Sequence, residues 1–346
     1  ARPAEAEMNR NRFLTFIINT GKSLILPAGM FLLIFILTRF IGQGQFMSWG
    51  NWKSIIQNTL LATCISLAMA CNLLNHRWDF SVGMMVILIP TLATPIVQAL
   101  NWGIFGFAAV NLVIGLLVGL LNGAAYLLIK VPAIVTSLGF YVIYESIILI
   151  YNGGTGARVY DSSLLKFAQI PGIFIAALAA FLIFYVIFTH TQFGYNCRSL
   201  AGSASLSVNN GISEKRNAIG CYLMMGFFAA IAGMIYLTMT GTIVADMREN
   251  GSATIMFESF PPVFIGFYLM RYTNLTAGIF WGTLSMKILT SGMIALGIPS
   301  SLQNVGTGLF LLIFIAFTSN QKKLAEAAKA KKRVAALHSK QNTAAA

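Results

Sequence analysis

The stretch Val110–Tyr151 decides the fold of this chain, and it reads VNLVIGLLVGLLNGAAYLLIKVPAIVTSLGFYVIYESIILIY. Lys130 and Pro132 divide it into two apolar segments, each long enough to cross a bilayer. Three glycines recur at spacings of four residues: Gly115, Gly119 and Gly123. That spacing places them on one helix face, where small residues let a second helix approach closely within lipid. The stretch predicts a polytopic membrane protein.

The composition supports the same fold class. Hydrophobic residues make up 57% of the chain, charged residues 10%, and the mean hydropathy is +0.75, whereas soluble domains carry about 25% charged residues. A spanning helix needs about 20 apolar residues. We therefore expect an all-α protein with ten transmembrane helices, some of them broken or kinked, around a central pathway. The expected spans lie near residues 22–41, 54–74, 80–99, 103–129, 132–151, 171–188, 217–240, 254–270, 273–296 and 299–318.

We expect three parts along the chain: an N-terminal segment 1–21, a transmembrane domain 22–318 and a basic tail 319–346. Two spans contain prolines, which free backbone groups that neighbours or water must satisfy. These prolines are Pro90 and Pro95 in the third span and Pro261 and Pro262 in the eighth. The two segments are either broken helices beside a pathway or kinked helices with no functional role.

The basic residues predict the orientation. Of the 23 lysines and arginines, 17 fall in the two terminal segments and in the loops expected on the same side. The other side carries Arg39, Lys53, Arg158, Lys166 and Arg248. Because positive residues stay inside, both termini and the loop 189–216 should be cytoplasmic. The net charge of +13 is then a topology signal and a contact with anionic lipid, and not a sign of nucleic-acid binding.

The chain shows no pattern typical of an enzyme. It has no phosphate-binding loop, no nucleophile elbow and no zinc-protease helix. The cysteines, Cys64, Cys71, Cys197 and Cys221, and the three histidines are too scattered to predict a disulfide framework or a metal site. If the protein moves a solute uphill, the energy must come from an ion gradient or from another subunit.

Two ionisable residues within the expected spans bear on that choice, Glu145 and Lys287. Charges in lipid are costly and commonly functional, so the pair could couple transport to protons or ions. Alternatively, Glu145 bonds to a neighbouring helix, and Lys287 pairs with Glu145, lines a wet cavity or extends to the interface. The sequence leaves these readings open.

The loop 189–216 favours an external energy source. Ser203 is a candidate N-cap for a short helix, and Asn210-Gly211 supplies a stop, since glycine tolerates the left-handed conformation at a helix end. A short helix between two spans can serve as a rigid contact for a partner.

Several motifs resemble the permease subunits of ribose-type sugar ABC importers, a family that includes autoinducer-2, galactose and xylose permeases and is related to branched-chain amino acid permeases. The resemblance covers most of residues 50–318. The family motif G-x-x-N-G corresponds to Gly119, Asn122 and Gly123, and the motif V-P-x-F-I-x-T-L-G to Val131, Pro132, Thr136 and Gly139. The family's D-L-S-V-G corresponds to Asp79, Ser81 and Gly83. The family's loop motif aligns through Gly194, Leu200, Gly202, Gly211 and Ile212, and Arg198 lies in the same loop.

The resemblance implies a subunit that pairs with a second permease across a two-fold axis in the bacterial inner membrane. It implies a coupling helix around Ser203, Ala204, Ser205 and Leu206 that docks on a cytoplasmic ATPase. That ATPase would hold ATP and Mg, and this chain would need no cofactor. An extracytoplasmic binding protein would deliver the solute, a monosaccharide or related polyol. Residues for the pathway or for helix packing would be Asp79, Ser81, Gly83, Gly115, Gly119, Asn122, Gly123, Pro132, Thr136, Gly139, Glu145 and Lys287.

The chain departs from the family pattern at three places. His76-Arg77-Trp78 stands where two glycines usually precede the D-L-S-V-G motif. Serines replace Asn, Glu and Ala in the coupling loop, and only Gly266 remains of four paired glycines near the eighth span. A divergent ATPase, a divergent substrate or a place in a heterodimer would account for these changes. An ion-driven carrier and a membrane scaffold with a degenerate pathway remain the alternatives.

Overall fold

The computed structural model describes residues 2–40, 45–154, 156–159, 162–169, 171–243, 251–318 and 320. The chain divides into two compact units, Ala1–Gly297 and Ile298–Ala346. The described part of the second unit is one helix over Ser300–Thr318. Apart from residue 320, the predicted basic tail 319–346 lies outside the described residues.

Eight helices in the described part of the chain are long and apolar enough to cross a membrane. They are Asn19–Phe40 within α1 (Arg2–Phe40), α2 (Trp49–Leu74), α3 (Val82–Leu100), α4 (Gly103–Ile129), α5 (Ala133–Ile150), α7 (Gly172–His190), α10 (Glu214–Thr240) and Ser300–Thr318. The two other predicted spans are also helical, as α11 (Gly251–Leu269) and α12 (Leu275–Ala295). The all-α polytopic class is therefore confirmed, with eight of the ten predicted segments meeting the length and apolarity of a span.

Short elements connect the long helices. They are η1 (Gln45–Met47), η2 (Tyr151–Gly154), β1 (Ala157–Arg158), α6 (Ser162–Leu165), η3 (Lys166–Ala168), α8 (Gln192–Gly202), α9 (Ala204–Asn209) and β2 (Thr242–Ile243). The strands β1 and β2 pair antiparallel, with Ala157 opposite Ile243. This two-stranded ribbon joins the connection after α5 to the end of α10.

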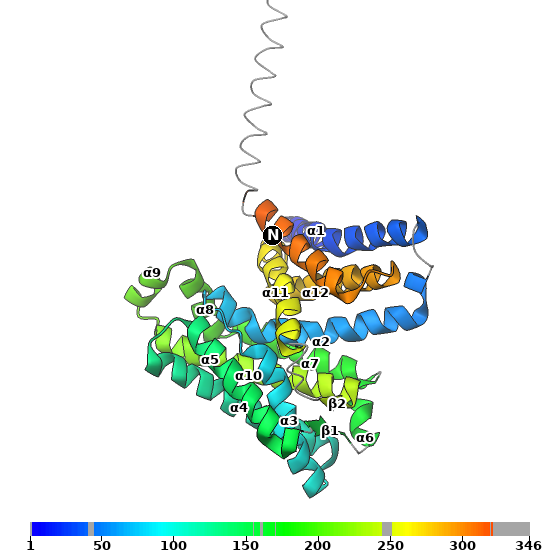
Figure 1. Cartoon of the computed structure of the whole chain (residues 1–346). Helices are drawn as coiled ribbons and strands as arrows, with labels where there is room; N and C mark the ends of the chain where they lie inside the picture. Colours follow the sequence, from blue (N-terminus) through cyan, green and yellow to red (C-terminus); the bar gives the residue numbers. More distant parts are fainter. Residues whose placement is uncertain are drawn as a thin grey trace, which may run out of the picture. The chain divides into compact units, whose positions relative to one another are not determined.

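Three helices form the interior of the first unit (Figure 1). In their most apolar windows α2, α3 and α10 are 72%, 72% and 78% buried, whereas α4, α5 and α7 are 28%, 22% and 28% buried. Helix α10 packs against α4, α2 and α3. The outer helices turn their apolar side chains outward, as lipid-facing or subunit-facing helices do.

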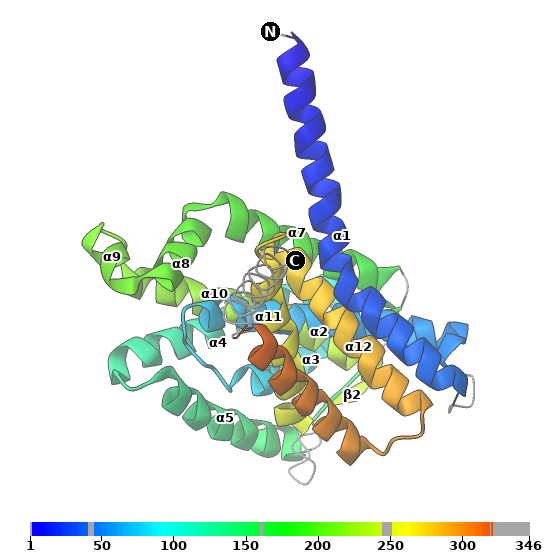
Figure 2. The same ribbon diagram turned by 90° about the horizontal axis from the view of Figure 1, so that it is seen from above.

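Helices α1, α11 and α12 form a second layer beside α2. Helix α12 packs against α1, α11 and α2, and Figure 2 shows α1 running along α12. Phe31 of α1 meets Phe46 and Trp52 at ring-centroid distances of 6.2 and 5.8 Å. The hydroxyls of Thr63 on α2 and Thr283 on α12 share a buried 2.7 Å hydrogen bond. A polar bond of this kind fastens two helices together in an apolar surrounding.

The proline-containing helices run without interruption. Helix α3 continues through Pro90 and Pro95, and α11 continues through Pro261 and Pro262. Pro90 has no N–H, so the carbonyl of Val86 loses its helical partner. A Cβ placed on Gly233 of α10 would lie 2.6 Å from that carbonyl oxygen. Because both helices are continuous, the broken-helix alternative is wrong. In α3, Gly233 lets α10 close over the freed carbonyl.

Candidate functional site

Residues from two separate motifs meet in one buried hydrogen-bond network. The backbone N–H and the hydroxyl of Ser81 both donate to Oδ1 of Asp79, at 2.8 and 2.6 Å. Nδ2 of Asn122 on α4 donates to the Ser81 hydroxyl at 2.8 Å, and the Tyr144 hydroxyl on α5 donates to Oδ1 of Asn122. All four residues are buried. The network joins the turn before α3 to α4 and α5.

Sequence reasoning missed Tyr144. It lies eight residues after the predicted site residue Thr136, a spacing that places both on one helix face. Thr136 and Tyr144 are both buried, and the Thr136 hydroxyl has no hydrogen-bond partner within the described part of the chain. This face of α5 points inward. The helical spacing between Thr136 and Tyr144 was the sequence signal that could have identified Tyr144.

The turn before α3 carries two buried charged residues, Arg77 and Asp79, each 4% exposed. Burial raises the pKa of the Asp79 carboxyl to about 6, while the bonds from Ser81 lower it. The Arg77 guanidinium lies over the Tyr126 ring, 6.0 Å from its centroid. The site thus holds a carboxyl whose protonated form is favoured by burial.

This turn also forms without the two glycines that the family usually has here. His76 has φ +59°, a left-handed conformation that glycine adopts without strain. Trp78 packs against Phe260 and Phe264 of α11, with ring-centroid distances of 5.6 and 5.8 Å. The bulkier turn therefore keeps a glycine-like backbone and uses its extra side chain to contact α11.

The predicted glycine face is a helix contact. A Cβ on Gly115 would lie 2.5 Å from the carbonyl oxygen of Gly226 on α10, and a Cβ on Gly119 would lie closer than 3.0 Å to the Tyr222 carbonyl. At Gly123 the nearest atom would be the Tyr222 Cβ, at 3.0 Å. The glycines therefore let the α4 and α10 backbones touch.

Three other motif residues lie apart from this contact. Gly83 is buried in the first turn of α3. Pro132 is exposed at the position before α5, and Gly139 is exposed with open space where a side chain would point. Gly139 is thus on the outer face of α5 and packs against nothing in the described part of this chain.

Lys287 pairs with a residue that sequence reasoning overlooked. Its Nζ lies 2.7 Å from Oε2 of Glu258 on α11, so the suggested pairing of Lys287 with Glu145 is wrong. Glu145 is partly exposed on α5. The missed signal was an acidic residue inside the predicted segment 254–270. The Glu258–Lys287 bond joins α11 to α12.

The loop 189–216 contains two helices, α8 and α9, where a single short helix was expected. Helix α8 is firmly packed: a Cβ on Gly194 would meet the Phe188 backbone at the end of α7. The Arg198 guanidinium lies over the Phe188 and Tyr195 rings, 5.3 and 4.7 Å from their centroids. Leu200 is buried. Helix α8 is therefore a fixed base.

Helix α9 projects from that base with the predicted caps. Ser203 is its N-cap and accepts from the Leu206 N–H at 3.5 Å, and Gly211 follows its end with φ +86°. The buried Ser207 shares a 2.8 Å bond with Ser199 of α8. Leu206 and Val208 are 64% and 47% exposed. The remaining predicted residues lie around them, with Gly202 ending α8, Ala204 and Ser205 exposed in α9, and Ile212 partly exposed after it.

Three cysteines that looked scattered in the sequence lie together at the base of α8. The Cys197 thiol donates to the backbone carbonyl oxygen of Cys71 on α2 at 3.8 Å, and Cys221 on α10 lies beside it. Asn75 donates to the Cys197 sulfur at 2.8 Å. All four cysteines of the chain are free and buried. The cluster holds α8 against two interior helices. The spacing of the cysteines in the sequence could not show that they lie together in the fold.

The fold and these sites define a polytopic permease subunit. Residues 52–317 match the model of the family described as "Branched-chain amino acid transport system / permease component", and the chain belongs to that family. It is a membrane transport subunit and not an enzyme.

Curated relatives match nearly the whole chain. The galactose/methyl galactoside import permease protein MglC of Escherichia coli (strain K12) is 23% identical, over 90% of this chain and 97% of that permease. The autoinducer 2 import system permease protein LsrC of Shigella flexneri is 24% identical, over 88% of both chains. No solved structure shows significant similarity to this chain.

Proposed function

We propose that this chain is the permease subunit of a bacterial inner-membrane ABC importer for a monosaccharide or related polyol. The support is the family match over residues 52–317 together with the galactose and autoinducer-2 import permeases that align with almost the whole chain. In this proposal all ten helical segments span the membrane, both termini are cytoplasmic, and residues 22–318 form the transport domain between a short N-terminal segment and the basic tail.

One observation carries the coupling role: a rigid loop that presents two apolar side chains to solvent. Helix α9 is capped at both ends and fixed to α8 through Ser199 and Ser207, while Leu206 and Val208 are exposed. Leu206 and Val208 are two residues apart and so lie on different sides of α9, where each is available to a partner. We assign α9 as the helix that docks on a separate ATPase, which holds ATP and Mg.

The exposed apolar face of α5 is the candidate contact for a second permease subunit or for lipid. Ile134, Val135, Leu138 and Val142 are 38%, 55%, 51% and 59% exposed. An extracytoplasmic binding protein completes the proposed importer. The ion-driven carrier is not favoured, because Lys287 is neutralised by Glu258 at 2.7 Å.

Co-purification with the ATPase tests the docking role. Leu206→Asp and Val208→Asp should abolish ATPase capture and ATP-dependent uptake, since a carboxylate would be forced into an apolar contact. The matched control is Asn209→Asp, which adds the same charge to an exposed position of α9 outside the apolar pair. Full capture and uptake with both apolar positions changed would remove the assignment.

Impermeant thiol labelling tests the topology. In intact cells a cysteine introduced at Ser162 should react and one at Ser203 should not, because the loop 189–216 is placed in the cytoplasm. The native cysteines are buried, and the labelling of the wild-type protein gives the background signal. Strong labelling at Ser203 from outside would overturn the orientation.

A further inference from the structure

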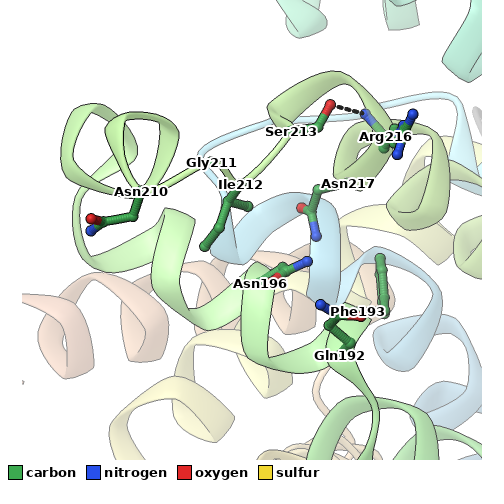
Figure 3. A pocket seen from close by; sticks show the side chains of 9 residues that line it. All are labelled: Gln192, Phe193, Asn196, Asn210, Gly211, Ile212, Ser213, Arg216 and Asn217. Atoms are coloured by element: carbon green, nitrogen blue, oxygen red, sulfur yellow. Dashed lines mark hydrogen bonds between the residues drawn. The ribbon is translucent and has the colours of Figure 1, made fainter.

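A cavity of about 490 Å³ lies between α8, the turn after α9 and the first turn of α10. Its lining includes Gln192, Phe193 and Asn196 from α8 and Ser213, Arg216 and Asn217 around the start of α10. Figure 3 shows the side chains of Asn196 and Asn217 facing each other across it. The cavity is separate from the Asp79–Asn122 network and from the exposed side chains of α9.

An unpartnered donor marks the inner wall of this cavity. Asn217 is 4% exposed, and its Oδ1 accepts from the Cys221 thiol at 3.6 Å. That bond directs Nδ2 the other way, where it has no hydrogen-bond partner in the described part of the chain. A buried donor without a partner costs about 1–3 kcal/mol, so a polar ligand that supplies an acceptor would bind favourably here.

The electrostatics favour an anion. Ser213 is the N-cap of α10, a helix of 27 residues whose N-terminus opens at the cavity. Helix N-termini attract negative groups through their free N–H donors and dipole. Arg216 adds a guanidinium, and no Asp or Glu lines the cavity. These features match a phosphate group.

The rest of the lining fits a larger, hydroxyl-rich body. A lone phosphate would fill little of about 490 Å³, a volume within the usual range for small-ligand sites. The amides of Gln192 and Asn196 offer both donors and acceptors to hydroxyl groups. The Phe193 ring supplies an apolar face. We propose that this cavity binds a small phosphorylated, hydroxyl-rich molecule of the sugar-phosphate class.

Such a ligand would bridge α8 and α10 at the base of α9. It would thereby regulate how firmly the coupling helix is held. This regulatory role rests on the proposed function, whereas the binding of the ligand does not. A phosphorylated sugar inside the cell could then report that imported sugar has accumulated.

Ligand-induced thermal stabilisation of the detergent-purified complex of permease and ATPase tests the binding. Glucose 6-phosphate is the probe, with glucose and inorganic phosphate as separate arms. We expect stabilisation by glucose 6-phosphate at millimolar concentration and much less by either arm alone. If glucose stabilises the complex as much as glucose 6-phosphate does, the cavity is not an anion site. If phosphate alone does so, the ligand need not be rich in hydroxyl groups.

Two variants locate the site. Arg216→Gln, at an exposed position, and Asn217→Leu should each weaken the apparent affinity for glucose 6-phosphate at least tenfold. Lys215→Gln is the matched control, since Lys215 is exposed and adjacent but does not line the cavity. If Arg216→Gln binds as the wild type does, or if Lys215→Gln loses as much affinity, the assignment is wrong. Because the readout is binding, it is independent of whether the complex transports a sugar.

Discussion

Asn122 on α4 donates a 2.8 Å hydrogen bond to the hydroxyl of Ser81, which lies 41 residues earlier at the start of α3. The same asparagine accepts from Tyr144 on α5. One amide therefore connects three elements inside the protein, with Asp79 at the end of the chain of bonds. Buried networks of this kind are stabilising when every member is satisfied and costly when one is removed.

Replacing Asn122 by leucine should destabilise the protein by about 1–3 kcal/mol, because Ser81 and Tyr144 would each lose a buried partner. Thermal unfolding in detergent measures the effect. Tyr144→Phe should give a smaller loss, since it removes one bond. Ser146→Ala on the exposed face of α5 is the control, because that hydroxyl bonds the nearby Val142 carbonyl of its own helix. An unchanged midpoint for Asn122→Leu would contradict the network.

The Asp79 carboxyl should make stability depend on pH. Its folded pKa is raised from 3.8 to about 6, so its protonated form is favoured in the fold. The contribution is fully present below pH 3.8 and is lost as pH rises through about 6, a difference of about 3 kcal/mol. The Asp79→Asn variant should therefore lose this part of the pH dependence.

The measurement is the thermal midpoint of wild type and Asp79→Asn between pH 4 and 8. Other carboxyls titrate in both proteins, so the difference between the two curves isolates Asp79. That difference should change most between about pH 4 and 6, where the folded and unfolded proteins differ in Asp79 protonation. Parallel curves would show that Asp79 is not desolvated.

Gly119→Leu should disrupt assembly, because the new side chain would be forced into the Tyr222 backbone. Overpacking costs about 1–3 kcal/mol, and here the obstacle is backbone that cannot rotate away. Gly139→Leu is the matched control, a helical glycine with open space around it. Yield and midpoint should fall for Gly119→Leu alone. Equal tolerance at both positions would mean that α4 and α10 do not touch at these glycines.

Bulky residues at the two glycines of the coupling loop should differ in effect. Gly211 has φ +86°, whereas Gly202 is helical with open space around it. Gly211→Val should strain the end of α9 by about 1–2 kcal/mol and reduce ATPase capture more than Gly202→Val. The membrane fold should survive in the double variant, as judged by expression and midpoint. Retained capture and ATP-dependent uptake in that variant would argue against a coupling role for the loop.

Breaking one side of the Glu258–Lys287 pair should cost more than removing both charges. The side chains are 36% and 17% exposed, so we expect about 1–3 kcal/mol for Glu258→Gln or Lys287→Gln. The double variant should recover part of the loss. Additive effects in this double-mutant cycle would show that the two charges are not coupled.

Local pattern predicted the helices and the caps of α9, because apolar length and the chemistry of serine and glycine act within a few residues. The partners of those elements depend on contacts distant in sequence. Lys287 meets Glu258 across a helix pair, and Cys197 meets Cys71 only after α8 folds back. The sequence predicted the start of α9 at Ser203, where the backbone is extended with a φ of −162°, but it did not predict helix α8 before it.

The contact of Val86 with Gly233 bears on how such a protein changes shape. A helix that lacks one hydrogen bond bends there more easily than elsewhere, and the missing bond faces a neighbour with no side chain. The Val86 carbonyl already lies against the Gly233 backbone, so α3 and α10 are in backbone contact where the bond is missing. The point at which α3 lacks a helical hydrogen bond is therefore enclosed among the most buried helices of the first unit, and the α10 backbone supports it there.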